Sequence, residues 1–579
     1  MKELSQEVRT VLAIVLSMVV ILVWGYFFGP KTPTRPAEQP GAQKPAASSP
    51  ATPGALGATS PPSTVGAAPE APAETAAAPA PRAAGEEQSL VVESGVYRVE
   101  LSNRGASARS WQLIREKDDV GKTLDLVHPA VSQQSGRWPL MLALEDTQQE
   151  TAVNSGLYEM TPSSGPVQAP AEVAFAWSDG HLAVTKRLKF DSNFVVAIET
   201  SVTFDGKPLP HAVAWRGGFG DMTAFAASEQ VKVVYSRGGS LNDIAAKKAG
   251  DEKNPGRPAS VPGTWDFAGI VDHYFAAVFL PDGESGVSLE HWKYDREVEV
   301  EGKKESEPVA EVAASTPATA PLRMRLFVGP KDLDVLARIR PPLTELVSFG
   351  SLAIIARPLF DFLKWIHRYV ANYGWAIVLM TIIINMVLFP LKWRSFHQML
   401  KMQKVMPEIK QIQDRYKKYS MRDPRKQDMN KEVMAVYSRE GVNPVGGCLP
   451  MVIQMPIWFA LYRMLDVAFE LRHAPWLFWV RDLSAKDPYY VLPILMCITM
   501  YFMQKLTPAT TADPAQQRMM NFMPLFMGFL FLRMASGLVL YILTSNVVGT
   551  AQQWFLYRVM PEAKTISSKK KGALEKKGK

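Results

Sequence analysis

Several amide and hydroxyl side chains of this chain lie inside strongly apolar segments, where an unpaired polar group is costly. Asn546, Thr550 and Gln553 follow a spacing of i, i+4 and i+7, which places them on one face of a helix. Thr381 and Asn385 are likewise one helical turn apart. Two explanations fit equally well: hydrogen bonds that hold helices together, and a wet groove that opens on the inner side of a membrane and is closed outside. Four further positions extend the pattern: Gln454, Tyr501, Gln504 and Asn521.

The sequence contains no compact set of catalytic or metal-binding residues. Two cysteines among 579 residues exclude a disulfide scaffold and a four-cysteine zinc site. A proton- or ion-coupled transporter is expected to bury a carboxylate near the middle of the membrane, and the apolar segments contain none there. We therefore expect no catalytic residue, no metal and no cofactor.

Six apolar segments are long enough, or nearly so, to cross a bilayer as helices. No A-x-A-like cleavage site follows the first one, so residues 1–29 are interpreted as an uncleaved signal anchor rather than a cleaved signal peptide. The other five would form a helical membrane core within residues 372–558. The expected spans are residues 11–28, 375–391, 445–467, 489–506, 519–534 and 537–556.

The charged residues predict how these spans are oriented. Residues 90–342 contain 27 Lys and Arg against 34 Asp and Glu, whereas residues 392–443 contain 13 against 6 and residues 558–579 contain 8 against 2. Basic loops stay on the cytoplasmic side. Six spans then place both termini in the cytoplasm and the acidic region outside, which is the layout of a multi-pass inner-membrane protein.

The outer region is predicted to be a large all-β domain at residues 88–345. Strict alternation of apolar residues from Phe194 to Phe204 and from Leu322 to Val328 is typical of half-buried strands. A Pro- and Ala-rich stretch at residues 30–87, with 13 Pro and 17 Ala, precedes it and is predicted to be a linker. Residues 346–371 follow as an amphipathic helix on the membrane surface, or alternatively as a core helix of the β-domain.

Residues 392–443 are predicted to form a charged helical hairpin in the cytoplasm, with a kink at Pro407. Met399, Met402, Met406 and Met429 belong to apolar stripes with helical spacing. These stripes can pack against each other, but flexible thioethers also suit surfaces that accept varied apolar partners. The lysine-rich tail at residues 559–579 has three interpretations: it is solvated, it contacts anionic lipid, or it contacts ribosomal RNA.

Four motifs in the C-terminal part carry a resemblance to a known family: Val442 to Pro450 (VNPVGGCLP), Gln454 to Trp458 (QMPIW), Asp487 to Tyr490 (DPYY) and Ser536 to Tyr541 (SGLVLY). They resemble the Oxa/YidC/Alb family of membrane-protein insertases, and the match runs from about Phe327 to the end of the core. The N-terminal anchor and large outer domain are similar to the Gram-negative form, in which that domain is a β-supersandwich.

The resemblance implies an insertase and chaperone that receives nascent membrane proteins in a hydrophilic groove, alone or with the Sec translocon. It implies the ribosome and the lipid bilayer as further partners and no small-molecule substrate. It also adds Tyr541 to the groove residues. One position departs from the bacterial pattern: Asn385 stands where an arginine is usual. The groove is therefore expected to work by hydration and hydrogen bonding, with Lys392, Arg394 or Lys505 as candidates to supply charge from its mouth.

Two other hypotheses remain at this point. A polytopic transporter with an outer binding domain would need buried carboxylates or repeated halves, and neither is visible in the sequence. An outer scaffold that is merely anchored by the spans leaves the hairpin and the inner polar residues unexplained.

Overall fold

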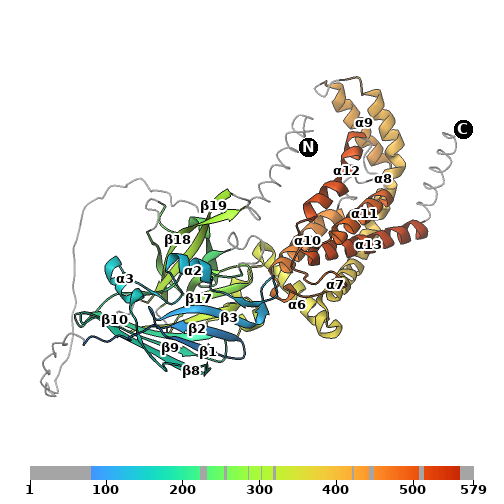
Figure 1. The fold of residues 1–579 in the computed structure, drawn as a ribbon. Coiled ribbons are helices and arrows are strands. Elements are labelled where there is room, and N and C mark those ends of the chain that lie inside the picture. Colours follow the sequence, from blue (N-terminus) through green and yellow to red (C-terminus); the bar gives the residue numbers. More distant parts are fainter. Residues whose placement is uncertain are drawn as a thin grey trace, which may run out of the picture. The chain divides into compact units, whose positions relative to one another are not determined.

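The computed structural model describes residues 80–221, 231–252, 257–283, 286–300, 303–316, 321–419, 423–442, 449–507 and 514–560. Of the two compact units, Met1–Ala77 and Ala78–Lys579, only the second contains described residues. The expected span at residues 11–28, most of the linker and residues 561–579 of the basic tail lie outside the described residues. The unit that is described contains the strands first and most of its helices afterwards (Figure 1).

Three sheets make up the β-domain. The largest has the strand order β14-β13-β16-β17-β20-β10-β9-β8-β6, with β11 paired to β10. Its strands are β6 (Glu159–Thr161), β8 (Ala171–Ser178), β9 (Leu182–Phe190), β10 (Val195–Phe204), β11 (Lys207–Pro208), β13 (Lys232–Arg237), β14 (Ser240–Ala245), β16 (Phe267–Val271), β17 (Phe275–Pro281) and β20 (Leu322–Pro330).

Two five-stranded sheets accompany it. One consists, in spatial order, of β4 (Thr123–Asp125), β3 (Ser107–Lys117), β2 (Tyr97–Ser102), β1 (Ser89–Glu93) and β7 (Val167–Gln168). The other consists of β15 (Ala259–Trp265), β18 (Val287–Val300), β19 (Lys303–Ser315), β12 (Ala212–Trp215) and β5 (Leu142–Ala143).

The alternation seen in the sequence corresponds to burial in the largest sheet. Every second residue of β10 is buried, and β10 pairs antiparallel with β20, which contains the second alternating stretch. Asp205 and Gly206 join β10 to β11 with φ angles of 50° and 77°, as a tight hairpin turn requires. The prediction of a strand-rich domain is therefore confirmed at these elements.

Aromatic side chains fill the main core of this domain. The ring of Trp111 lies 5.9 Å from that of Trp215 and 6.3 Å from that of Phe190, centroid to centroid. Within the described residues, segments between the strands of this β-rich domain also form two short helices and a 3-10 turn. These are α2 (Pro129–Ser135), α3 (Thr147–Ser155) and η1 (Ala246–Lys248).

A second apolar cluster links the largest sheet to the chain that follows it. Val278 and Phe327 of the sheet share this cluster with Leu343 and Phe349. Because buried apolar area is stabilising, this cluster holds the segment before the helices against the β-domain. The segment contains α5 (Leu333–Leu336), η2 (Thr344–Leu346) and η3 (Gly350–Leu352).

The remaining helices carry the candidate groove residues. They are α6 (Ala353–Val370), α7 (Tyr373–Val387), α8 (Phe389–Arg415), α9 (Arg425–Arg439), α10 (Leu449–Val467), α11 (Val491–Leu506), α12 (Pro514–Phe531) and α13 (Ser536–Val559), with η4 (Phe469–Leu471) after α10. Within the described ranges no helix passes a length and hydropathy test for a membrane span alone, whereas α7 and α8 pass it as a pair bent by 56°.

The bend corrects the expected span at residues 375–391. Helix α7 ends at Val387 because Pro390 lacks a backbone N–H and its ring disfavours continuation of the preceding helix. Pro390 instead occupies the first turn of α8, where proline is tolerated. The chain therefore changes direction before the residues expected to complete the span.

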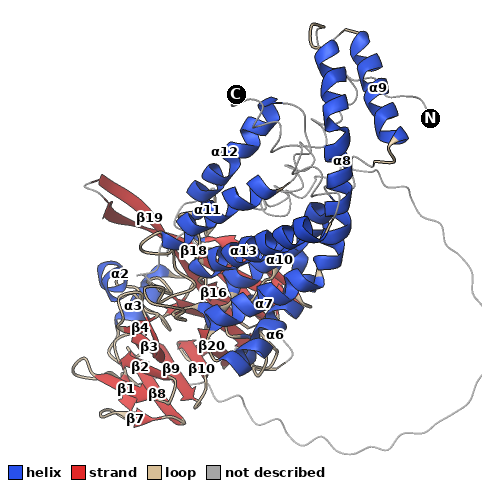
Figure 2. Cartoon of the chain, turned by 90° about the vertical axis from the view of Figure 1, so that its right-hand side faces the viewer, coloured by secondary structure: helices blue, strands red, loops and turns tan. Residues whose placement is uncertain are grey.

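The hairpin expected in residues 392–443 is formed by α8 and α9, which lie side by side (Figure 2). Met402, Met406 and Met429 lie in or against its apolar core. Helix α8 continues through Pro407 to Arg415, so this proline does not end the helix. The first apolar stripe is shared, however, because Met399 packs in a different cluster with residues of α13.

Candidate functional site

Side chains from α7, α8 and α13 meet in a polar cluster around Asn385. Asn385 and Thr381 are almost fully buried, and the Asn385 amide nitrogen donates to the Thr381 carbonyl at 2.8 Å. On the facing helix, the Gln552 amide nitrogen donates to the carbonyl of Asn385 at 3.0 Å. The amide nitrogen of Asn385 also lies 3.4 Å from the hydroxyl of Ser545. Asn385 therefore joins α7 to α13.

A cation completes this cluster. The Lys392 ammonium group donates to the side-chain oxygen of Asn385 at 2.6 Å and to that of Gln552 at 3.2 Å. Lys392 belongs to α8, so its long side chain reaches back across the bend that follows α7. Hydrogen bonds from a charged donor are stronger than those between neutral groups. The positive charge is consequently fixed beside Asn385.

A second group of polar side chains lies on α11 and α13. The Gln553 amide nitrogen donates to the Thr507 hydroxyl at 3.0 Å, and the Gln504 amide nitrogen donates to the Met520 carbonyl. Four buried polar atoms of this group are among those that have no hydrogen-bond partner within the described residues. They are Gln504 Oε1, Asn546 Nδ2, Thr550 Oγ1 and Gln553 Oε1.

These unpaired atoms distinguish the two explanations of the polar pattern. Hydrogen bonds between helices would satisfy the amides within the protein, as the Asn385 cluster does. A buried polar atom without a partner costs about 1–3 kcal/mol. The second group therefore has unused capacity to bind water or the polar groups of another chain, which favours a hydrated groove on this face of α13.

The remaining groove candidates divide into contacts and exposed positions. Gln454 hydrogen-bonds the hydroxyl of Tyr541, so α10 and α13 share a third polar contact. Tyr501 and Asn521 are exposed rather than gathered with the others. Lys505 lies over the Tyr501 ring at 5.2 Å. Tyr501 and Asn521 therefore share no hydrogen bond with the buried polar residues among the contacts of the described ranges, and their place in the groove stays a prediction.

The two halves of the chain each match a family model. Residues 89–362 match the YidC periplasmic domain, and residues 365–564 match the 60Kd inner membrane protein family. A membrane protein insertase YidC from Ralstonia nicotianae is 32% identical to this chain over 589 residues, with 97% of this chain and 99% of the relative covered. The chain belongs to the YidC family.

Other members and solved structures extend this comparison. The YidC insertase of Wolinella succinogenes is 30% identical over 99% of this chain and 98% of its own length. A crystal structure of an active YidC insertase with its first transmembrane domain resolved is 18% identical, covers 82% of this chain and 94% of its own, and has a TM-score of 0.34. YidC from Thermotoga maritima is 13% identical, covers 80% and 99%, and has a TM-score of 0.26.

Sequence reasoning missed four members of the polar clusters in this YidC-family chain. Ser545 and Gln552 lie off the face defined by Asn546, Thr550 and Gln553, so the helical spacing excluded them. Both are directly adjacent to a residue of that face. Consecutive polar residues in an otherwise apolar helix were the signal that could have identified them. The other two are Thr507, which follows α11, and Lys392, which was expected only as a charge near the mouth.

The amphipathic helix of this YidC-family chain contributes one face to the helical core. Phe360, Leu363 and Ile366 of α6 are buried in the same apolar cluster as residues of α7 and α10. The side chains of Trp365 and Tyr369 are exposed, and their rings lie 5.2 Å apart. Aromatic rings with one polar end suit a membrane interface, so α6 retains the residues that a surface position requires.

Proposed function

We propose that the chain inserts nascent membrane proteins into the bacterial inner membrane through a groove lined by α7, α11 and α13. The observation that carries this proposal is the set of four unpaired polar atoms on α11 and α13. In hydrocarbon, a translocating segment would leave its own backbone groups unpaired at a cost of several kcal/mol each. A wet groove lowers that cost for part of the membrane thickness.

Within this groove, Asn385 acts as a positioning residue for Lys392. Its side-chain oxygen accepts the 2.6 Å hydrogen bond that holds the ammonium group toward α13. An acidic tail of a substrate would be attracted to this charge, and a neutral polar tail would use the amides. Lys392 thereby takes over, from α8, the charge that the family resemblance places at the position of Asn385 on α7.

The proposed topology has six spans, of which five form the core, with both termini in the cytoplasm and the β-domain in the periplasm. The basic counts of residues 392–443 and 558–579 support this orientation. Helices α7 and α8 would cross the membrane as a bent pair. The bend supports a short inner end of this span, at which polar residues would reach the groove. The hairpin of α8 and α9 would then project into the cytoplasm.

The proposed partners follow from this arrangement. Nascent membrane proteins are the substrates, and the lipid bilayer is the medium that receives them. The Sec translocon assists the insertion of some of these substrates. The lysine-rich tail supports transient contact with the ribosome, because several Lys side chains favour the phosphate backbone of RNA. The methionines of the hairpin core support its stability, whereas exposed Met434 offers an apolar contact to partners.

Site-specific photocrosslinking tests the groove. A photoreactive residue at Thr381, Gln454 or Asn546 should crosslink to a nascent chain held on the ribosome. The same probe at Phe529, which is exposed on α12, serves as the control position for a lipid-facing or unrelated surface. Crosslinks to Phe529 alone would contradict the proposed groove.

A substitution provides a second test. Asn385→Leu removes the acceptor of the Lys392 ammonium group, a hydrogen bond worth about 1.5–3 kcal/mol. We expect insertion of substrates with polar outer tails into reconstituted vesicles to fall roughly tenfold, since 1.4 kcal/mol corresponds to that factor. Val387→Leu alters an exposed neighbour and should leave insertion unchanged. Equal activity of both variants would refute the role of Asn385.

A further inference from the structure

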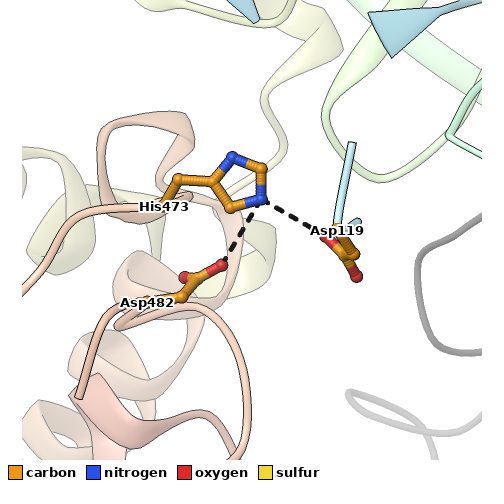
Figure 3. A group of neighbouring side chains, drawn as sticks. All are labelled: Asp119, His473 and Asp482. Atoms are coloured by element: carbon orange, nitrogen blue, oxygen red, sulfur yellow. Dashed lines mark hydrogen bonds and ion pairs between the residues drawn. The ribbon is translucent and has the colours of Figure 1, made fainter. Parts of the chain in front are cut away.

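Three side chains with metal-ligand chemistry converge on the side of the β-domain that contacts the loop after η4. Asp119 lies in the turn between β3 and β4, whereas His473 and Asp482 lie in the loop between η4 and α11 (Figure 3). The Nε2 atom of His473 is 3.3 Å from a carboxylate oxygen of Asp119 and 3.7 Å from one of Asp482. All three ligand atoms lie within 4.8 Å of one another.

Local hydrogen bonds hold the turn that presents Asp119 and the carboxylate of Asp482. Asp118 accepts the backbone N–H of Lys122 at 2.7 Å, which fixes the turn that presents Asp119. One oxygen of Asp482 accepts the backbone N–H and the hydroxyl of Ser484, both at 2.7 Å. The other oxygen of Asp482 faces His473. The loop therefore supplies a carboxylate that is already oriented toward the imidazole.

The neighbouring cation, Arg472, is paired with carboxylates of its own. Arg472 forms an ion pair with Asp221 at 2.6 Å and lies 3.7 Å from Glu116, and its side chain is almost fully buried. It also donates to the carbonyl of Lys117 at 2.6 Å. With a neutral imidazole, Asp119, His473 and Asp482 together carry two negative charges, which matches a divalent cation.

The distances are compatible with a metal site, although His473 Nε2 also hydrogen-bonds Asp119 at 3.3 Å without one. A hydrogen bond between nitrogen and oxygen is usually about 2.7–3.2 Å long, and one Nε2–H points at a single acceptor. Ligands bound to tetrahedral Zn²⁺ at about 2.0–2.2 Å are separated by roughly 3.4 Å. Both distances from His473 are close to that value, and all three ligand atoms lie within 4.8 Å of one another.

We propose that Asp119, His473 and Asp482 bind a zinc ion that ties the β3–β4 turn to the loop between η4 and α11. One imidazole and two carboxylates are ligands that Zn²⁺ accepts, and three protein ligands leave a fourth position for water. Ca²⁺ and Mg²⁺ prefer all-oxygen shells and should bind far more weakly. The ion would strengthen a contact that already contains the Arg472–Asp221 ion pair.

The test uses the full chain in detergent, purified without a histidine tag. Zn²⁺ titrated calorimetrically should bind with one-to-one stoichiometry, and Mg²⁺ at the same concentration should give no saturable heat. Asp119→Asn and His473→Gln should each weaken Zn²⁺ binding about tenfold or more. His181→Gln is the matched control. His181 also forms an ion pair with one aspartate, Asp205, at 2.7 Å, but it lies just before β9, away from the proposed site.

A structural readout distinguishes a clip from surface adsorption. Added Zn²⁺ should slow hydrogen exchange in residues 118–122 and 472–484 of the unaltered chain, and a chelator should reverse the effect. The same Zn²⁺ affinity in Asp119→Asn as in the unaltered chain would overturn the proposal, as would no saturable binding at all. Neither measurement involves insertion activity, so the zinc site stands or falls independently of the proposed function.

Discussion

Replacing Lys392 with methionine removes the ammonium group that contacts both Asn385 and Gln552 while preserving much of the side-chain length. Two unit charges about 5 Å apart at an effective dielectric constant of 20 attract each other by about 3 kcal/mol. Water in the groove and salt screen part of this attraction. We therefore expect Lys392→Met to lower the insertion rate of substrates with acidic outer tails by about tenfold, and by much less for neutral polar tails.

The assay compares two substrates that differ only in the tail, one with three acidic residues and one with three serines, in vesicles containing the purified protein. Lys392→Arg should retain the preference for the acidic tail because it keeps the charge. Lys410→Met removes an exposed cation on the same helix and is the control for a general loss of positive charge. An equal loss for both tails in Lys392→Met would refute an electrostatic role and leave only a structural one.

Two further predictions concern the hairpin and the loop after α10. Met402→Asp places a charge in the hairpin core, where the native side chain is 7% exposed, and should destabilise the α8–α9 contact by about 3 kcal/mol. Trypsin should then cut α9 faster than in the unaltered chain. Met434→Asp, at a position 51% exposed, is the control and should have little effect. Burial raises the pKa of Glu470 to about 7, against the opposing charge of Lys364. The folded protein then binds more protons than the unfolded chain above pH 4.5, so this group lowers stability as the pH rises to about 7, by on the order of 3 kcal/mol. Glu470→Gln should remove that part of the pH dependence in thermal unfolding, and an unchanged profile would contradict the assignment.

Prediction from the sequence was most accurate where the spacing of apolar residues within one segment determines which of its faces is buried. The residues of strand β10 alternate because one face of its sheet is buried and the other is more exposed. The hairpin followed from its apolar spacing for the same reason. In each case the periodicity of one segment contains the needed information.

Prediction was weaker wherever two segments meet. Helical spacing could not show that Gln552, rather than Gln553, faces Asn385, because the rotation of α13 depends on its neighbours. Nor could it show that Lys392 folds back across the bend after Val387. The depth of Asn521 along the chain predicted a place in the groove, and its side chain is exposed on α12, so spacing alone did not show its neighbours.

The chemistry of the unpaired atoms on α11 and α13 has a consequence for selectivity. Gln504 and Gln553 offer carbonyl oxygens, Asn546 offers an amide nitrogen, and the Thr550 hydroxyl can both donate and accept. Such a lining discriminates poorly between one peptide segment and another, because every backbone presents both donors and acceptors. A surface of this kind favours brief, interchangeable contacts over tight ones. The same groups that tolerate many clients would therefore also let each of them leave.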